Sequence, residues 1–121
     1  MQLLCRRSEE GLALGLGLVE ADVKKFSFKD SQMLKIPHMG WNTLRILKRN
    51  PLIEQSKDEK RFYFVHSYFV QPDDQNIIVA ASNHGGEFCS MFQNENIFGV
   101  QFHPEKSHRF GLDLFSNFLS L

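Results

Sequence analysis

The sequence predicts an α/β chain that combines a partly antiparallel sheet with a helix at its C-terminal end. Stretches rich in β-branched and aromatic residues follow one another in the middle of the chain, as in consecutive strands. A short turn signal separates two of them at hairpin spacing, and the C-terminal residues repeat apolar side chains at helical spacing. We expect one short helix, five or six strands and one closing helix. Two helices are too few to cover both faces of such a sheet.

The first third of the chain is predicted as a helix followed by extended segments. Residues 1–10 place apolar side chains on one helical face and stop at Gly11, so we expect a short helix there. Residues 12–18 alternate leucine with small residues, which is typical of a loop that another backbone approaches closely. Residues 19–28 alternate apolar and polar side chains, as a half-buried strand does. Residues 34–38 are expected to be extended, because a proline biases the residue before it away from the helical region.

The strongest strand signal of the chain lies at residues 61–70, which read RFYFVHSYFV. The polar and turn-rich residues 50–61 before it predict an exposed connection. A proline and two aspartates within residues 71–74 predict a turn after it. We therefore expect one strand between two connections.

A hairpin and a further strand are predicted next. Residues 76–82 form a short apolar run that is typical of a buried strand. Residues 84–86, His-Gly-Gly, predict a tight turn, after which residues 87–92 return as the second strand of the hairpin. Residues 97–102 predict one more strand, rich in aromatic and β-branched side chains.

The chain is predicted to close with a helix from about Ser107 to Leu121, with Ser107 as its N-cap. Apolar residues three and four positions apart fall on one face of such a helix. This face contains Phe110, Leu114, Phe118 and Leu121, and is widened by Phe115 and Leu119.

Charge and hydropathy argue against three classes of protein. Fourteen lysines and arginines balance fourteen aspartates and glutamates, which argues against nucleic-acid partners and against anionic membrane surfaces, since both need a basic excess. The longest apolar runs, 62–65 and 77–81, are far too short to span a membrane. The sequence has no signal-peptide pattern. We therefore expect a cytoplasmic protein whose two cysteines, Cys5 and Cys89, are free thiols.

The residues best suited to chemistry are His103 and Glu105, at the end of a predicted strand. Residues two apart in an extended chain point to the same side, and Pro104 between them prevents a helix. A carboxylate beside an imidazole holds one tautomer and stabilises the protonated ring, as in the orienting half of a nucleophile–histidine–acid triad. The tripeptide alone is also compatible with ordinary surface polar residues. A metal site with His108 is a third interpretation, but no cysteine pairs accompany the cluster and we expect no metal.

The other histidines and the cysteines have simpler interpretations. His38 and His66 are expected to be structural hydrogen-bonding residues. Cys5 lies in a predicted helix without the glycines that a strained nucleophile turn needs. Cys89 alternates with its neighbours in a predicted strand, where burial is expected. We expect neither thiol to be a nucleophile.

Three blocks of the chain resemble a known family in their order and spacing. They are residues 36–44, 61–70 and 96–107, which read IPHMGWNTL, RFYFVHSYFV and NIFGVQFHPEKS. Together with SEEG at residues 8–11, they resemble the glutaminase subunit of imidazole glycerol phosphate synthase, a class I amidotransferase of histidine biosynthesis. The segment HPE marks class I amidotransferases generally, whereas PHMGWN and YFVHSY are more specific to this subunit. The resemblance covers nearly the whole chain.

The resemblance implies an α/β fold of the class I glutamine amidotransferase (flavodoxin-like) type, here a truncated sheet with antiparallel strands and a C-terminal helix. Residues 1–121 would then be the C-terminal part of a single domain. It further implies hydrolysis of glutamine to glutamate by a cysteine–histidine–glutamate triad that needs no cofactor. The ammonia would pass to a cyclase partner, a (β/α)8 barrel that forms a heterodimer with the glutaminase.

The resemblance also implies roles for individual residues. His103 matches the catalytic histidine of the family, and Glu105 matches the glutamate that orients it. Positions that match those gripping the substrate glutamine are Gln2, Glu10, Ser67 and Tyr68. Positions that match those facing the cyclase partner are Trp41, Asn42 and Tyr63.

The sequence departs from the family pattern at the nucleophile. The family places its cysteine in a Gly-x-Cys-x-Gly turn immediately before the residues that match Met1 and Gln2, and these 121 residues contain no such motif. We therefore expect the chain alone to be inactive. We also expect it to be poorly soluble, because a sheet without its neighbouring strands exposes an apolar edge.

Two alternatives stay open at this point. EKSHRFG at residues 105–111, with LGLGLVEADVKKF at residues 14–26, resembles paralogues that supply ammonia for sugar modification in surface-polysaccharide synthesis. A chain without a nucleophile is also compatible with a non-catalytic remnant that only docks on the cyclase.

Overall fold

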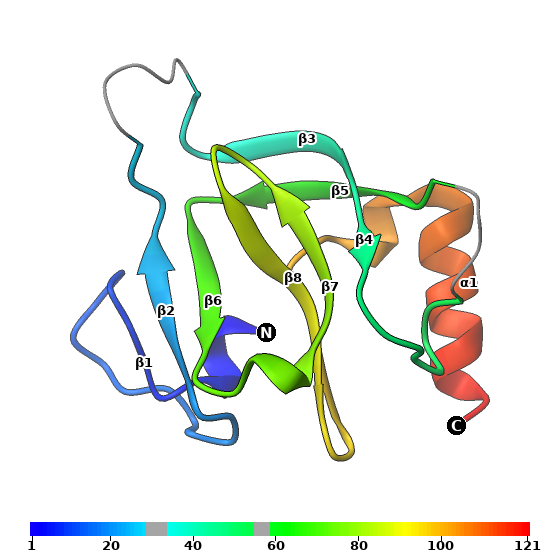
Figure 1. Cartoon of the computed structure of the whole chain (residues 1–121), viewed down its shortest axis with the longest axis horizontal. Helices are drawn as coiled ribbons and strands as arrows, with labels where there is room; N and C mark the ends of the chain where they lie inside the picture. Colours follow the sequence, from blue (N-terminus) through cyan, green and yellow to red (C-terminus); the bar gives the residue numbers. More distant parts are fainter. Residues whose placement is uncertain (29–33, 55–58) are drawn as a thin grey trace.

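A computed structural model describes residues 1–28, 34–54 and 59–121. It shows a mixed α/β fold in which mostly antiparallel strands form two sheets and a helix lies at the C-terminal end (Figure 1). In these ranges the larger sheet has the strand order β1-β2-β6-β8-β7-β4, with β9 also paired to β8, and the smaller sheet pairs β3 with β5. The predicted α/β class, antiparallel strands and C-terminal helix are confirmed.

The elements of both sheets are short. The strands are β1 (Arg7–Ser8), β2 (Ala21–Lys25), β3 (His38–Thr43), β4 (Arg45–Ile46), β5 (Arg61–His66), β6 (Tyr68–Pro72), β7 (Ile78–Asn83), β8 (Glu87–Asn94) and β9 (Ile97–Val100). The helix is α1 (His108–Leu119), and the 3₁₀ turns are η1 (Gln2–Leu4), η2 (Gln75–Ile77) and η3 (Pro104–Lys106). No helix in the described ranges is long and apolar enough to cross a membrane.

The hairpin of β7 and β8 forms where the sequence predicts it. The two strands pair antiparallel, with Asn83 opposite Glu87 at the turn. The His84 N–H donates to the Gly86 carbonyl at 2.9 Å, and Gly85 has a φ of 71°, a conformation that glycine adopts without strain. Strand β9 follows β8 antiparallel and ends at Val100, two residues earlier than predicted.

The strand predicted over residues 61–70 is two strands. The chain bends at Ser67, where β5 ends and β6 begins. Strand β5 pairs with β3 in the small sheet, whereas β6 pairs with β2 and β8 in the large sheet. Strand β6 extends to Pro72, so the turn predicted at residues 71–74 begins only after Pro72. Inward-facing residues continue at alternate positions on both sides of the bend. Alternation of buried and exposed side chains cannot reveal that the chain passes from one sheet to another when the same alternate positions stay buried in both strands.

The predicted helix at residues 1–10 is wrong. Only the single turn η1 and the two-residue strand β1 form there. The backbone instead pairs with residues much later in the chain: the Arg6 N–H donates to the Ala21 carbonyl at 3.1 Å, and β1 lies parallel to β2. The prediction for residues 12–18 is confirmed, because a Cβ at Gly15 would lie 2.0 Å from the Cys5 carbonyl oxygen. Tertiary pairing overrides the local helical pattern.

Strands β3 and β4 have no counterpart among the predicted elements. The extended segment expected at residues 34–38 leads into β3, which begins at His38 immediately after Pro37. Strand β4 pairs with Ala80 and Ala81 of β7. Of the exposed connection predicted at 50–61, residues 55–58 lie outside the described residues, and Leu52 and Ile53 are buried.

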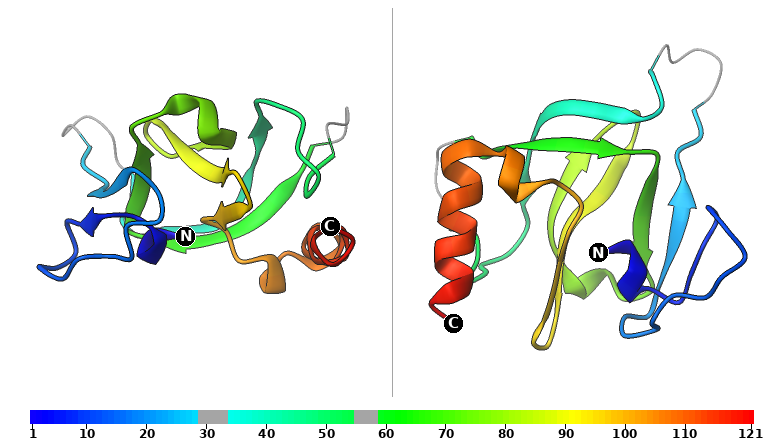
Figure 2. Two further views of the ribbon diagram at one scale, coloured as in Figure 1. Left: turned by 90° about the horizontal axis from the view of Figure 1, so that it is seen from below. Right: turned by 180° about the vertical axis from the view of Figure 1, so that it is seen from behind.

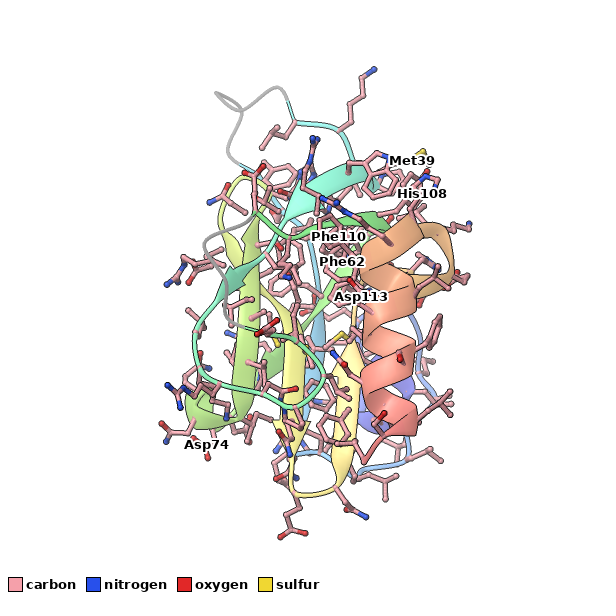
Figure 3. All side chains as sticks on the ribbon, turned by 90° about the vertical axis from the view of Figure 1, so that its right-hand side faces the viewer. Met39, Phe62, Asp74, His108, Phe110 and Asp113 are labelled. Atoms are coloured by element: carbon pink, nitrogen blue, oxygen red, sulfur yellow. The ribbon has the colours of Figure 1, made fainter. Side chains whose placement is uncertain are left out.

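Helix α1 packs beside β5 and η3 at one side of the molecule (Figure 2). Phe62 of β5 and Phe110 of α1 lie with their ring centroids 6.0 Å apart, and both are labelled at the helix–sheet boundary in Figure 3. Leu114 is buried, but Phe118 and Leu121 of the predicted apolar face are exposed. Ser107 is the N-cap residue of α1, as predicted, but its side chain makes no cap hydrogen bond.

Within the described residues, two clusters of buried side chains form the core. One lies around the aromatic residues of β5 and β8, and the other around Val23, Val70 and Cys5. Large apolar side chains are also exposed on the 12–18 loop, on α1 and at the C-terminal residue: Leu12, Leu14, Leu16, Leu18, Leu112, Phe115, Phe118, Leu119 and Leu121. Low solubility of the isolated chain stays a prediction.

Candidate active site

His103 and Glu105 lie where β9 leads into η3, and their side chains meet. Nδ1 of His103 is 2.8 Å from Oε1 of Glu105. The carboxylate only accepts, so Nδ1 carries the proton and donates it, which leaves Nε2 for proton transfer to a reacting group. The side chains are 36% and 55% exposed, so both reach solvent. The histidine–carboxylate pair that the tripeptide suggests is formed.

The backbone under His103 is held by strand β5. The His103 N–H donates to the Tyr63 carbonyl at 2.8 Å, and the Ser107 hydroxyl donates to the His103 carbonyl at 2.6 Å. The same hydroxyl accepts the Tyr63 N–H at 3.0 Å, and Ser107 is fully buried. This explains why the N-cap residue Ser107 makes no side-chain cap hydrogen bond to α1: its hydroxyl connects η3 to β5 instead.

The carboxyl of Glu105 is ionised at neutral pH. Partial desolvation acts to raise its pKa, but its own backbone N–H, the hydrogen bond with His103 and the charge of Lys106 outweigh this effect. The pKa of Glu105 is therefore lowered from its ordinary value. An ionised carboxylate on Nδ1 is the arrangement that orients an imidazole and stabilises its protonated form.

A cavity of about 510 Å³ opens beside His103. It brings together five residues that the sequence had already singled out: Gln2, Glu10, Ser67, Tyr68 and His103. The rest of its wall comes from Met1, Leu3, Val65, His66, Val100, Gln101 and Phe102. Glu105 is not among the lining residues and lies behind His103 through their hydrogen bond.

Gln2 connects the N-terminal segment to the wall of this cavity by two hydrogen bonds. Its side-chain amide donates to the Tyr68 carbonyl at 3.0 Å and to Gln101 Oε1 at 3.2 Å. Figure 2 shows the N-terminal turn beside β6, although the two segments are far apart in the sequence. The helix expected at residues 1–10 is wrong, yet Gln2 and Glu10 still reach the cavity.

The residues matched to the partner face lie on β3 and β5 and are not among those that line this cavity. The rings of Trp41 and Tyr63 meet edge to face at 6.0 Å, and Trp41 stacks on His108 at 5.4 Å. Trp41 is 42% exposed and lines a second hollow of about 470 Å³ with Arg61 and His108. Asn42 differs from Trp41 and Tyr63, because its side-chain amide makes hydrogen-bonding contacts within the protein, with His38 and with the Asn83 carbonyl.

The interior contacts of Asn42 are ones that sequence reasoning missed. Its amide Nδ2 lies 3.1 Å from His38 Nε2, and His38 Nδ1 lies 2.8 Å from His66 Nε2. His66 in turn contacts the Tyr68 carbonyl with Nδ1 at 2.7 Å. The sequence predicts His38 and His66 as separate hydrogen-bonding residues; only the register of β3 on β5, which sets them opposite each other, joins them.

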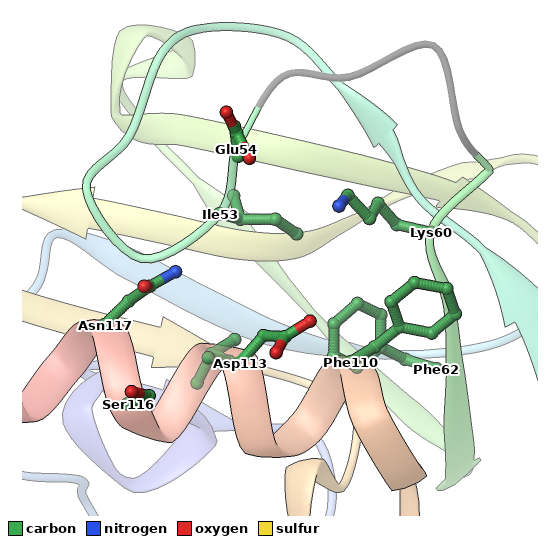
Figure 4. Close-up of a pocket in the computed structure, with 9 residues that line it drawn as sticks. Ile53, Glu54, Lys60, Phe62, Phe110, Asp113, Ser116 and Asn117 are labelled. Atoms are coloured by element: carbon green, nitrogen blue, oxygen red, sulfur yellow. The ribbon is translucent and has the colours of Figure 1, made fainter.

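A third hollow, of about 340 Å³, lies between α1 and the chain before β5 (Figure 4). Lys60, Asp113 and Asn117 line it together with apolar side chains. None of the residues predicted to act in chemistry or partner contact reaches it. In the described ranges, no group of three or more histidine, cysteine or acidic side chains is placed to hold a metal ion.

Comparison with known proteins relates this geometry to a family. The model of class-I glutamine amidotransferases matches residues 1–120. The chain belongs to the class I glutamine amidotransferase family. A crystal structure from Thermoplasma acidophilum, of a protein named as part of a GMP synthase, has the same fold. It aligns with a TM-score of 0.62 at 22% identity, over 83% of this chain and 47% of that one.

Relatives within this amidotransferase family carry a more specific name, imidazole glycerol phosphate synthase subunit HisH. The protein of Leptospira borgpetersenii is 46% identical over 100% of this chain and 60% of its own length. HisH 2 of Pseudomonas aeruginosa is 44% identical over 99% of this chain and 58% of its own length. HisH of Methanocaldococcus jannaschii is 47% identical over 100% of this chain and 60% of its own length. The chain therefore spans about three fifths of the curated relatives it matches.

The two cysteines of this amidotransferase chain are both buried free thiols. Burial raises the pKa of Cys89 to about 12 and also raises the pKa of Cys5. Neither is among the residues that line the cavity at His103. A protonated, buried thiol is a poor nucleophile.

Proposed function

We propose that residues 1–121 are the C-terminal part of a single glutaminase domain, that of the imidazole glycerol phosphate synthase subunit. The observation that carries this proposal is the cavity where His103 meets Gln2, Glu10, Ser67 and Tyr68. The identity of 44–47% to the HisH relatives reported above supports it along the whole chain. The family-model match over residues 1–120 supports a single domain.

In the proposed reaction His103 moves protons and Glu105 orients it. A cysteine thiol gives its proton to Nε2 of His103, and the thiolate attacks the side-chain amide carbon of glutamine. The amide C–N bond then breaks, the nitrogen takes the proton back from His103, and ammonia leaves a γ-glutamyl thioester. Water, deprotonated by the same ring, hydrolyses the thioester to glutamate and restores the thiol. The nucleophile comes from outside these 121 residues, because Cys5 and Cys89 are buried and protonated.

The remaining lining residues suit the recognition of an amino acid. We assign the α-amino and α-carboxylate groups of glutamine to the backbone at Ser67 and Tyr68, with Glu10 and Gln2 at the same cavity. A carboxylate such as Glu10 suits an ammonium group, and backbone N–H groups suit a carboxylate. No cofactor is part of this reaction.

We further propose that the β3–β5 face receives the cyclase partner, a (β/α)8 barrel. Trp41 and Tyr63 supply aromatic surface there, which protein interfaces favour. Lys106 lies 5.8 Å from the Tyr63 ring centroid, and Arg61 shares the hollow of Trp41. Such cationic neighbours fit an acidic partner surface. Cytoplasmic location of the heterodimer fits the two free thiols.

The alternative of a subunit that feeds surface-polysaccharide synthesis is not favoured. The relatives reported above are all named as imidazole glycerol phosphate synthase subunits. The second alternative, a remnant that only docks on the partner, is an outcome of the test below.

The test is an assay of glutamate and ammonia release from glutamine. We expect release by the full-length protein that contains this chain when the cyclase subunit is present, and none by the 121-residue chain alone. Loss of release in a His103→Ala variant ties the activity to this site. Release by the 121-residue chain that disappears with Cys5→Ala would overturn the assignment of the nucleophile. Binding to the cyclase without any release would favour the docking remnant.

A further inference from the structure

A continuous row of hydrogen-bonding groups crosses the interior between the β3 face and the cavity. It runs from the Asn42 amide through the rings of His38 and His66 to the Tyr68 carbonyl. His38 and His66 are 6% and 7% exposed, so solvent does not replace these contacts. His66 also lines the cavity, and the carbonyl at the end of the row accepts a second hydrogen bond, from Gln2.

The proton positions along this row follow from its ends. The Tyr68 carbonyl only accepts, so His66 donates with Nδ1–H and its Nε2 becomes an acceptor. His38 must then donate to it with Nδ1–H, which makes His38 Nε2 an acceptor for the Asn42 amide. The two Nδ2 hydrogens of Asn42 are thereby used, one on His38 and one on the Asn83 carbonyl at 2.9 Å. One arrangement of donors satisfies every group.

Both rings are uncharged in this arrangement. Burial, with the neighbouring rings of His66 and His84, lowers the pKa of His38 to about 4. Burial also lowers the pKa of His66 to about 4, against the opposing effect of its bond to the Tyr68 carbonyl. The row is a set of neutral dipoles with a fixed direction and no ion pair.

We propose that the row is a positioning device: it holds the Tyr68 carbonyl at the cavity wall and couples that carbonyl to the inward-facing Asn42 side chain of β3. His38 touches no residue assigned to chemistry and acts only through its neighbours. The inference rests on the proposed function for its meaning, since that function makes one end the glutamine cavity and the other Asn42, the neighbour of Trp41 on the strand proposed to face the partner. A change in the hydrogen bond between Asn42 and His38 is therefore expected to change the position of the Tyr68 carbonyl at the glutamine site.

The first test is the tautomer of each ring, which needs no activity. In the full-length protein with ¹⁵N-labelled histidine at pH 7, we expect His38 and His66 each to carry a single proton, on Nδ1. Free neutral histidine favours the opposite, Nε2-protonated tautomer, so the result is diagnostic. An Nε2 proton on either ring overturns the proposed row.

The second test changes one end of the row and reads the other. Asn42→Asp replaces the donor facing His38 with an acceptor, so we expect His38 to bind a second proton. The chemical shifts of His66 Nδ1 (¹⁵N) and of the Tyr68 carbonyl (¹³C) should then change. The matched control is Asn50→Asp. Asn50 likewise donates to a side chain, Gln93, and accepts the backbone N–H of Leu52, but lies outside the row. Unmoved His66 and Tyr68 signals in Asn42→Asp would refute the coupling.

The third test separates positioning from simple packing, in the full-length protein with its cyclase subunit. His38→Asn keeps a donor near the place of Nδ1, whereas His38→Leu removes it. We expect His38→Leu to raise KM for glutamine about tenfold, the equivalent of about 1.4 kcal/mol, with a smaller change in kcat, and His38→Asn to recover most of it. Equal KM values in the two variants would overturn the positioning role. A wild type without glutaminase activity would refute the proposed function, while the tautomer test would still decide the row.

Discussion

The molecule contains two histidine arrangements whose surroundings differ in two respects, the charge of the partner and the burial of the pair. His103 faces the carboxylate of Glu105 at 2.8 Å, and both side chains reach solvent. His38 faces the neutral ring of His66, also at 2.8 Å, and both are buried. The two hydrogen bonds therefore have the same length but join the histidine to partners of different charge. A carboxylate lets an imidazole gain and lose a proton, whereas a buried neutral partner keeps it uncharged and directional.

This difference leads us to assign proton transfer to one arrangement and positioning to the other. Variants should therefore affect the two in different observables. Changes at His103 and Glu105 should appear in the rate of the reaction. Changes in or around the buried pair should appear in binding, tautomers and stability.

The largest expected effect is that of His103→Ala on kcat. In the proposed reaction the ring takes part in both the formation and the hydrolysis of the thioester, so its loss should lower glutamate release by at least about 10⁴-fold. Steady-state assays of the full-length protein with the cyclase subunit measure it, with Cys89→Ser as a control of unchanged rate. A reduction below about tenfold would identify another residue as the base.

Glu105→Gln should lower kcat by less than His103→Ala. Glutamine can still accept the Nδ1–H of His103 with its amide oxygen, but it lacks the charge that stabilises the protonated ring. We expect the reduction to be smaller than that of His103→Ala by about one to two powers of ten. Parallel assays of the two variants make the comparison, and a larger loss in Glu105→Gln would reverse the assigned roles.

Mild acid should weaken the fold through the buried pair. In the unfolded chain His38 and His66 bind protons near pH 6.5, whereas in the folded chain their pKa values are about 4. Between these values the unfolded state binds more protons, so the free energy of unfolding falls as the pH falls. With these pKa values we expect a loss of about 5 kcal/mol for the pair between pH 7 and pH 4.5.

Urea unfolding at these two pH values measures that loss. A double variant, His38→Asn with His66→Asn, serves as the control and should lose most of the pH dependence above pH 4.5. A wild type whose stability is constant over this range would contradict the neutral state of the buried rings.

The smallest expected effect concerns the support under His103. A Cβ at Gly111 of α1 would lie 1.8 Å from the Pro104 carbonyl oxygen of η3. Gly111→Ala should therefore lower the free energy of unfolding by about 2 kcal/mol, more than the gain in helix propensity returns. Gly86→Ala is the matched control, since nothing lies within 4 Å of its Cβ position. Equal stability of the two variants would show that η3 and α1 can move apart to accommodate the added methyl group at little cost in free energy.

Local signals were enough to predict parts of the fold. The β7–β8 hairpin and helix α1 follow from turn residues and apolar spacing within a few positions. The break at Ser67 could not be predicted, because alternation keeps its phase while the partner strand changes. The N-terminal helix failed for a similar reason: β2, far along the chain, supplies the hydrogen bonds that a helix would have made.

The candidate site divides in the same way. His103 and Glu105 are two residues apart and meet as predicted, but the predicted extended backbone is wrong, because Glu105 lies in the 3₁₀ turn η3 that begins at Pro104. Gln2 and Tyr68 reach the same cavity through tertiary structure, and in the sequence only the family resemblance points to them. The His38–His66 contact spans 28 positions and depends on the register of β3 on β5, which no local pattern encodes.

The most direct test of the central claim is to trap the covalent intermediate. The full-length protein is mixed with glutamine in the presence of the cyclase subunit, quenched in acid, and digested for peptide mass mapping of the γ-glutamyl thioester. Our account predicts the adduct on a cysteine outside these 121 residues, and its absence in a His103→Ala variant. An adduct on Cys5 or Cys89, or one that forms equally well without His103, would contradict the account.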